Sequence, residues 1–252
     1  MPPGSLIHVG EKKTEQVSID FMDYNEENFG EKTESKIENV FKLSDTPTVS
    51  WINIIGLHDI SIFEKIGNHF DIHPLVLEDI LNTGQRPKFE DFDRYMLIIL
   101  KMLQYDDKNE EIINEQVSLI LTYNCVLSFQ EIKGDIFNPI RERIRSGKGR
   151  IRKRGADYLT YTLVDAIVDH YFIILEKLGE RIEGIEQELI SNPNPEMLQK
   201  IYTLKQEMLN IKKSIWPLRE VISNFQKNES TLIQDSTDIF LRDVYDHTIQ
   251  VH

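Results

Sequence analysis

Three polar side chains late in the chain could bind a cation together. Asp243, Asp246 and His247 are spaced at i, i+3 and i+4, so in a helix they lie on one face. Carboxylate oxygens and imidazole nitrogens are common metal donors. The other interpretation is a solvated polar face, because the apolar stripe of the same segment points the opposite way. The spacing alone leaves both interpretations open.

Three further acidic residues could supply metal ligands. Glu78 and Asp79 are adjacent in a short apolar segment, where they either occupy a solvated edge or meet a cation. Asp165 lies within an apolar run, in which a charge is costly unless it is paired or coordinated. Both a salt bridge to an arginine and a metal site would account for Asp165.

The donor types restrict the chemistry. Sets rich in carboxylate oxygen favour Mg²⁺ or Ca²⁺ first, and Co²⁺ or Mn²⁺ second. A single cysteine, Cys125, excludes an internal disulfide and a cysteine-based zinc site. The sequence has no phosphate-binding P-loop, nucleophile elbow, His-Glu-x-x-His motif or calcium loop. We therefore expect a divalent cation as ligand, no organic cofactor and no enzymatic activity.

A basic run occupies residues 141–154 and has two interpretations. It could bind nucleic acid or phosphate, or it could be a helix end and loop whose charges offset neighbouring acids. The second is favoured because no aromatic residue is interleaved and the net charge of the chain is −13. The eight cations are Arg141, Arg143, Arg145, Lys148, Arg150, Arg152, Lys153 and Arg154.

Length and composition are those of a folded protein with a substantial core. The chain has 252 residues, 40% of them hydrophobic and 28% charged, which is ordinary for one large or two small globular domains. No run of about 18 apolar residues indicates a membrane span, and no apolar leader follows the first residues. We expect a soluble, intracellular chain.

The first half of the sequence predicts a sheet mixed with short helices. A polar, acidic loop is expected from Asn25 to Lys36. The expected strands are 17–23, 48–55, 94–105, 112–123 and 126–130. The expected helices are about 35–43, about 61–69, and one from Pro74 to near Gly84. Segment 1–134 should therefore form an α/β layer domain with a mixed sheet.

The second half is helical. A basic helix over 136–145 precedes two apolar stripes, 161–189 and 197–225, separated by a break at 192–195. Such stripes predict an antiparallel coiled-coil hairpin within segment 135–230, with Pro217 interrupting the second helix. A last stripe starts a helix in segment 231–252, and no capping signal closes it. Its members are Thr237, Leu241, Val244, Thr248 and Val251.

Four sequence blocks resemble the CorA family of magnesium and cobalt transporters. They are His73-Pro-Leu-Val-Leu-Glu-Asp-Ile-Leu81, Arg86-Pro-Lys, Trp216-Pro-Leu-Arg-Glu220 and Arg242-Asp-Val-Tyr-Asp-His247. The resemblance covers essentially the whole chain. It implies an α+β fold with α/β/α layers and a mixed sheet, followed by a long antiparallel helical hairpin and the start of a stalk helix. The family's two membrane helices and Gly-Met-Asn signature do not occur in these 252 residues, so we expect a regulatory domain truncated before the membrane.

The resemblance also implies two divalent-cation sites that use carboxylates from neighbouring subunits. Asp79 of one subunit and Asp243 of the partner subunit would hold the first ion. The residues implied for the second site are Glu78 and Asp165, with Asp246 and His247 close by.

By this resemblance the domain lies on the cytoplasmic side of the cell membrane, within a homopentamer. It would sense intracellular Mg²⁺ or Co²⁺ at the subunit interfaces and couple the ion to channel gating. Two functions from other classes are the alternatives. One is a coiled-coil scaffold that uses only the hairpin, and the other is nucleic-acid binding through residues 141–154.

Overall fold

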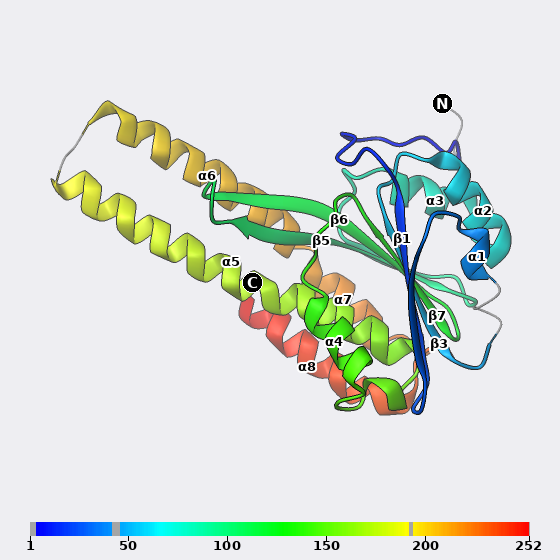
Figure 1. Ribbon diagram of the computed structural model, residues 1–252. Coiled ribbons are helices and arrows are strands. Elements are labelled where there is room, and N and C mark those ends of the chain that lie inside the picture. The colour runs from blue at the N-terminus through cyan, green and yellow to red at the C-terminus, as the bar shows by residue number, and fades with distance from the viewer. Residues whose placement is uncertain (1–3, 42–45, 192–193, 252) are drawn as a thin grey trace.

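A seven-stranded sheet forms the centre of the protein (Figure 1). The computed structural model describes residues 4–41, 46–191 and 194–251. The sheet order is β2-β1-β3-β7-β6-β5-β4, and all neighbours are antiparallel except the parallel pair β3 and β7, so the predicted mixed sheet is confirmed. The strands are β1 (Ser18–Tyr24), β2 (Phe29–Glu34), β3 (Val49–Ile55), β4 (Lys88–Asp91), β5 (Met96–Asp106), β6 (Glu111–Leu121) and β7 (Cys125–Gln130).

The two edge strands differ from the sequence prediction. β2 lies where a loop was expected, and every residue but the last is exposed. An edge strand with no buried face has no alternation of apolar and polar residues to reveal it. β4 has only four residues and follows Pro87 directly, which hides it among turn signals. The interior strands are apolar runs because both of their faces are covered; every residue of β7 is buried.

Three short helices cover one face of the sheet. They are α1 (Glu38–Phe41), α2 (Ile60–Phe70) and α3 (Pro74–Leu81). Asp59 caps α2, and His73 caps α3. Pro74 occupies the first position of α3, as the sequence predicted. α1 begins later than the expected start near residue 35, and positions 42 and 43 lie outside the described residues.

The other face is covered by the second half of the chain. The elements are α4 (Asn138–Ser146), a short 3-10 turn η1 (Ile151–Lys153), α5 (Ala156–Ser191), α7 (Leu218–Gln226) and α8 (Asp235–Val251). One apolar cluster joins this face of the sheet to side chains of all four α-helices. A separate cluster joins the opposite face to α1, α2 and α3. The sheet therefore lies between two helical layers, which confirms the expected α/β/α arrangement.

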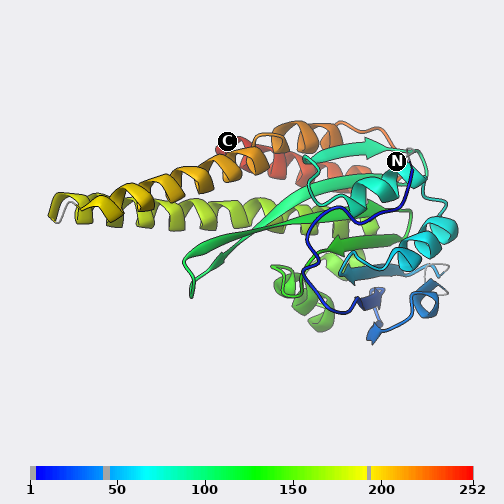
Figure 2. The same cartoon turned by 90° about the horizontal axis from the view of Figure 1, so that it is seen from above.

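α5 and α6 (Pro195–Ile215) form the predicted antiparallel hairpin, which extends well beyond the sheet (Figures 1 and 2). Arg181 of α5 pairs with Glu207 of α6 at 2.5 Å, and Glu188 pairs with Lys200 at 2.7 Å. The connection includes Asn192 and Pro193 of the predicted break, which lie outside the described residues.

Pro217 ends the second arm of the hairpin, as predicted. α6 stops at Ile215 and α7 begins at Leu218, because proline lacks the N–H that would continue the hydrogen-bond ladder. The division of the chain into segments 1–134, 135–230 and 231–252 stays a prediction.

Within the described residues, one helix, α5, has the length and the apolar composition that a membrane-spanning helix needs. Its most apolar window is 61% buried inside the protein. Side chains such as Leu163, Ile167 and Ile174 pack into the cluster beneath the sheet. The same composition is typical of a helix in a protein core, and that is the place α5 occupies.

Two acidic side chains are buried where the pairing of β6 with β7 ends. Glu115 is 1% exposed and accepts the backbone N–H groups of Glu131 and Ile132 at 3.1 Å each. Glu131 accepts the N–H of Gln116 at 2.8 Å and pairs with Lys13 at 2.9 Å. Burial raises the pKa of Glu115 to about 8, although the two backbone N–H groups oppose this shift. Glu115 is therefore largely protonated near neutral pH.

The raised pKa of Glu115 predicts a loss of stability as the pH rises. The folded chain binds this proton more tightly than the unfolded chain, so the contribution is complete below the unfolded pKa, near 4.5, and is lost toward about pH 8. Between pH 5 and 8, the melting temperature of Glu115→Gln should fall less than that of wild type. A difference of about 1 kcal/mol in the free energy of unfolding corresponds to roughly 2–4 °C. The matched control is Glu111→Gln on the same strand, which is exposed. Equal pH slopes for wild type and Glu115→Gln would contradict the prediction.

Candidate metal centre

α8 lies alongside α5, and its apolar stripe fixes the rotation of the helix. Thr237, Leu241, Val244, Thr248 and Val251 are all buried, as the spacing predicts. The carboxylate of Asp157, at the start of α5, accepts the N–H of Gln234 just before α8 at 3.0 Å. Both helices therefore start at the same place and run in the same direction (Figure 1). This packing brings the polar edge of α8 next to the polar edge of α5.

Asp165, Asp169 and His247 meet along the contact between the two helices. One donor atom from each side chain lies within 4.8 Å of the other two. The Nδ1 atom of His247 is 3.3 Å from a carboxylate oxygen of Asp169. The hydroxyl of Tyr161 donates to Oδ2 of Asp165 at 3.4 Å, a long and weak contact. Two carboxylates and an imidazole form a donor set that accepts Mg²⁺, Mn²⁺ or Co²⁺.

Asp165 is the electrostatically unusual member of this cluster. Its side chain is half-buried, and its Oδ1 atom is buried with no hydrogen-bond partner among the described residues. The pKa of Asp165 is raised to about 6, mainly by burial and then by the charges of Asp169 and Asp243, while His247 opposes the shift. The salt bridge to an arginine that the sequence left open is not found within the described parts of the chain. A bound cation would supply the missing charge.

The structure places the remaining predicted residues of α8 at the edge of the same cluster. Asp243 is exposed one helical turn before His247, close enough to Asp165 to raise the pKa of its carboxyl group. Asp246 is also exposed. These carboxylates are therefore available to a neighbouring molecule.

Glu78 and Asp79 lie elsewhere, on α3 at the opposite face of the sheet (Figure 1). Glu78 accepts the N–H of Gly4 at 2.6 Å. Asp79 pairs with Lys88 at 2.6 Å and accepts an N–H of Gln85 at 2.5 Å. One chain alone does not bring these two acids to the cluster on α5 and α8.

The sequence analysis did not identify Asp169. The signal was present, because Asp169 follows Asp165 by four residues in the same apolar run, and that spacing puts both carboxylates on one helix face. Which of the three polar groups of α8 would meet this pair depended on how the two helices pack. His247 is the one that does, with Asp243 beside it.

The basic run at 141–154 is largely engaged within the protein. Arg141 pairs with Asp135 at 2.5 Å, Arg145 with Glu31 at 2.5 Å, and Lys153 with Glu26 at 3.0 Å. Two further guanidinium groups lie over aromatic rings, Arg150 over Phe240 and Arg152 over Phe29. Five of the eight cations thus have partners in their own chain, as expected for a run that offsets neighbouring acids.

Comparison with known proteins identifies relatives among transporters. A family model described as CorA-like Mg²⁺ transporter protein matches residues 48–252. The cobalt/magnesium transport protein CorA of Thermotoga maritima is 49% identical over 251 residues, which cover all of this chain and 71% of that protein. The cobalt/magnesium transport protein CorA of Methanocaldococcus jannaschii is 23% identical over 80% of this chain and 62% of that protein.

Solved structures share the fold. The soluble domain of CorA from Methanocaldococcus jannaschii superposes with a TM-score of 0.74 at 19% identity, covering 92% of this chain and 88% of that one. The complete CorA magnesium transporter of the same organism gives a TM-score of 0.72 at 18% identity, covering 94% of this chain and 71% of that one. The α+β architecture with its long helices is therefore that of the CorA soluble domain.

The charge of Asp165 predicts a stability effect that depends on pH. Without divalent cations at pH 7.5, Asp165→Asn should raise the melting temperature by roughly 2–4 °C, equivalent to about 1 kcal/mol, because it removes a half-buried charge beside Asp169. The pKa of Asp165 is raised to about 6, so at pH 5 the wild-type carboxyl is mostly protonated and the difference should shrink. Melting in a chelator at both pH values tests this. The exposed Asp107→Asn serves as control, and an equal shift at both pH values would show that charge is not the cause.

Proposed function

The chain belongs to the CorA family of Mg²⁺ transporter proteins, and from this membership we propose that it is the cytoplasmic domain that senses intracellular Mg²⁺ for a divalent-cation channel. The observation that supports this proposal most directly is the cluster of Asp165, Asp169 and His247 on α5 and α8. In this cluster the buried Oδ1 atom of Asp165 has no hydrogen-bond partner among the described residues. The transported ions, Mg²⁺ and Co²⁺, are cargo of such a channel, and the sensing ion is a bound ligand.

Two acidic groups on opposite sides of the sheet favour sites that lie between subunits. Asp79 on α3 and Asp243 on α8 both reach solvent, and each is accessible to a second copy of the chain. In the proposal, Asp79 of one subunit and Asp243 of the partner subunit bind one ion. Glu78 joins Asp165 at the second site, where Asp246 and His247 lie close by. We add Asp169 to this second site because it lies beside Asp165 and His247.

The local contacts of the α3 acids indicate what must change when an ion binds. The carboxylate of Asp79 is held by Lys88 and Gln85, and that of Glu78 by the N–H of Gly4. Rotation of the side chains of Lys88 and Gln85 frees the carboxylate of Asp79 without moving α3. These are partly exposed contacts, and an exposed ion pair stabilises by only about 0–1 kcal/mol. A divalent cation therefore competes with them readily.

Electrostatic repulsion supplies the switch. Two carboxylates about 4 Å apart repel by roughly 4 kcal/mol at an effective dielectric constant of 20. A bound divalent cation reverses that repulsion and holds the two subunits together. At about 100 times the dissociation constant, mass action favours the bound state by about 2.7 kcal/mol per site. When Mg²⁺ falls, repulsion returns, the subunits separate along α8, and the pore of the homopentamer opens.

The donor set accepts more than one ion. Carboxylate oxygens suit Mg²⁺ and Ca²⁺, whereas the imidazole of His247 increases the affinity for Co²⁺. Its Nδ1 atom is 3.3 Å from the carboxylate of Asp169, a separation at which both atoms can bind one ion. The ion specificity of the second site thus depends on His247.

Removing either half of the first site should abolish the response to Mg²⁺. We expect wild-type chain to gain thermal stability and to self-associate as Mg²⁺ is added, in melting and sedimentation experiments. Asp79→Asn and Asp243→Asn should each lose most of both responses, by up to about 2.7 kcal/mol at saturation. Asp107→Asn, in the exposed turn between β5 and β6, should respond as wild type does.

This experiment also separates the alternatives. If both variants respond to Mg²⁺ as the wild-type chain does, the assignment of the interface site is wrong. A coiled-coil scaffold predicts no response of any of the four proteins to Mg²⁺.

A further inference from the structure

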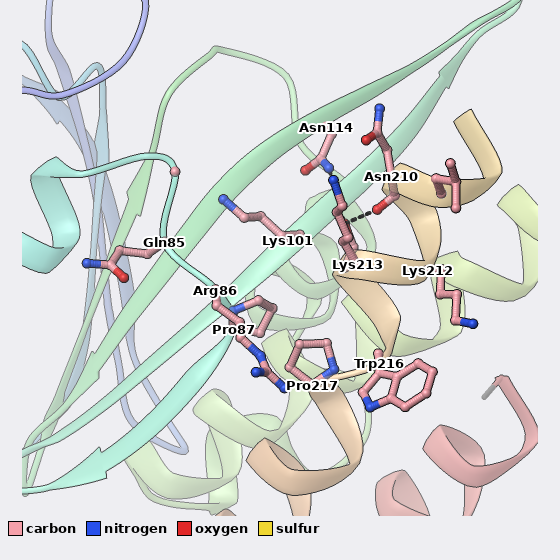
Figure 3. A pocket seen from close by; sticks show the side chains of 13 residues that line it. Gln85, Arg86, Pro87, Lys101, Asn114, Asn210, Lys212, Lys213, Trp216 and Pro217 are labelled. Atoms are coloured by element: carbon pink, nitrogen blue, oxygen red, sulfur yellow. Dashed lines mark hydrogen bonds between the residues drawn. The ribbon is translucent and has the colours of Figure 1, made fainter. Parts of the chain in front are cut away.

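A large cavity lies at the base of the hairpin. Its walls come from strands β5 and β6, the loop between α3 and β4, and the end of α6 with Pro217 (Figure 3). Its volume is about 770 Å³, which is within the range of pockets that enclose small organic ligands. The proposed cation sites use α3, α5 and α8. The cavity meets them at Gln85, whose side chain lines the cavity and donates to Asp79.

The cavity is strongly cationic within an acidic chain. Its lining includes Arg86, Lys101, Lys212 and Lys213 and no aspartate or glutamate, although the chain as a whole carries a net charge of −13. In the described parts of the chain, Arg86, Lys212 and Lys213 form no ion pair. Cations around a cavity without local acids attract an anion.

Lys101 is the most buried of these four cations. Its ammonium group is partly buried and donates to the carbonyl of Thr83 at 2.7 Å and to the amide oxygen of Gln116 at 3.4 Å. Both acceptors are neutral, and an ammonium group has a third N–H to donate. Burial lowers the pKa of Lys101 to about 8, although the negative charge of Glu131 opposes this shift. An anion in the cavity could accept the third N–H of this ammonium group.

The cavity lining also includes apolar rings, those of Pro87, Trp216 and Pro217. The indole of Trp216 is 54% exposed, and the ammonium of Lys212 lies 4.8 Å from its ring centre. Trp216 follows the last residue of α6 and precedes Pro217, which breaks the helix. Its indole lies in the wall of the cavity. Figure 3 shows Arg86 reaching toward Pro217, with Lys213 beside Asn114 on the opposite wall. Bases of nucleotides stack on exposed aromatic rings of this kind.

We propose that this cavity binds a nucleoside triphosphate, with the polyphosphate held between Arg86, Lys101 and Lys213 and the base lying on Trp216 beside Lys212. An inorganic anion would use the cations alone, whereas a nucleotide uses both walls of the cavity. Several N–H donors on charged groups suit the phosphate oxygens. The nucleotide is a regulatory ligand here, since no group in the cavity is arranged for phosphate transfer.

Isothermal titration with ATP, without divalent cations, tests the assignment on the 252-residue chain. Wild type should bind ATP saturably. Lys101→Gln and Arg86→Gln should each weaken binding about tenfold or more, the usual effect of losing a charge-assisted contact. Lys205→Gln on the exposed side of α6 is the matched control and should bind as wild type does. Thermal melting of each variant verifies that it is folded.

A second arm tests the base. Trp216→Leu should weaken ATP binding and leave the affinity for tripolyphosphate unchanged. In a Trp51→Phe background, ATP should quench the fluorescence of Trp216, because Trp51 is the other tryptophan. Asp79→Asn and Asp243→Asn should keep wild-type affinity for ATP, so this result is separate from the Mg²⁺ response.

The proposal is overturned by any of three results. Wild type could show no saturable binding of ATP. Tripolyphosphate could bind as tightly as ATP, which would remove the role of the base. Folded Lys101→Gln and Arg86→Gln could bind ATP as wild type does, which would place the ligand elsewhere.

Discussion

α8 packs on α5 through a stripe of two threonines and three aliphatic side chains, and this contact decides which polar groups of the two helices can meet. The hydroxyl of Thr248 donates to the carbonyl of Val244 in its own helix at 2.8 Å, so a polar side chain is buried without needing a partner on α5. Rotating α8 by one residue, about 100°, would bury Asp243 instead and expose Val244. The acidic cluster thus exists because an apolar contact elsewhere on the same helix fixes its orientation.

The sheet imposes the second constraint. Helices cover both faces of the sheet. The acids of α3 lie on one side of it, and those of α5 and α8 lie on the other. A single chain can therefore satisfy Glu78 and Asp79 only with local partners, which are the N–H of Gly4 and the side chains of Lys88 and Gln85. Any arrangement that uses both sets of carboxylates for one ion requires a second copy of the protein.

Features with a strong one-dimensional signal could be predicted from the sequence. The stripe of α8, the start of α3 at Pro74 and the break at Pro217 depend on neighbouring residues only, and the structure has them where expected. The strands β2 and β4 could not be predicted, because an exposed edge strand carries no buried face. The cluster was predicted in part. Asp165 and His247 were named, whereas their meeting with Asp169 depends on the packing of two helices some 80 residues apart in sequence. The cationic cavity was out of reach for the same reason, since its walls come from four separated segments.

The continuity of α5 has a mechanical consequence. Asp165 and Asp169 lie in the part of this helix that is packed under the sheet, and the same uninterrupted helix reaches Ser191 at the end of the hairpin. From Asp169 to Ser191 the rise is roughly 33 Å, with only α6 to support the distal part. A tilt of about 5° at the cluster would displace the far end by about 3 Å over that length. The hairpin therefore amplifies motion: a small tilt of α5 at Asp165, Asp169 and His247 displaces the far end of the helix by about the length of a side chain.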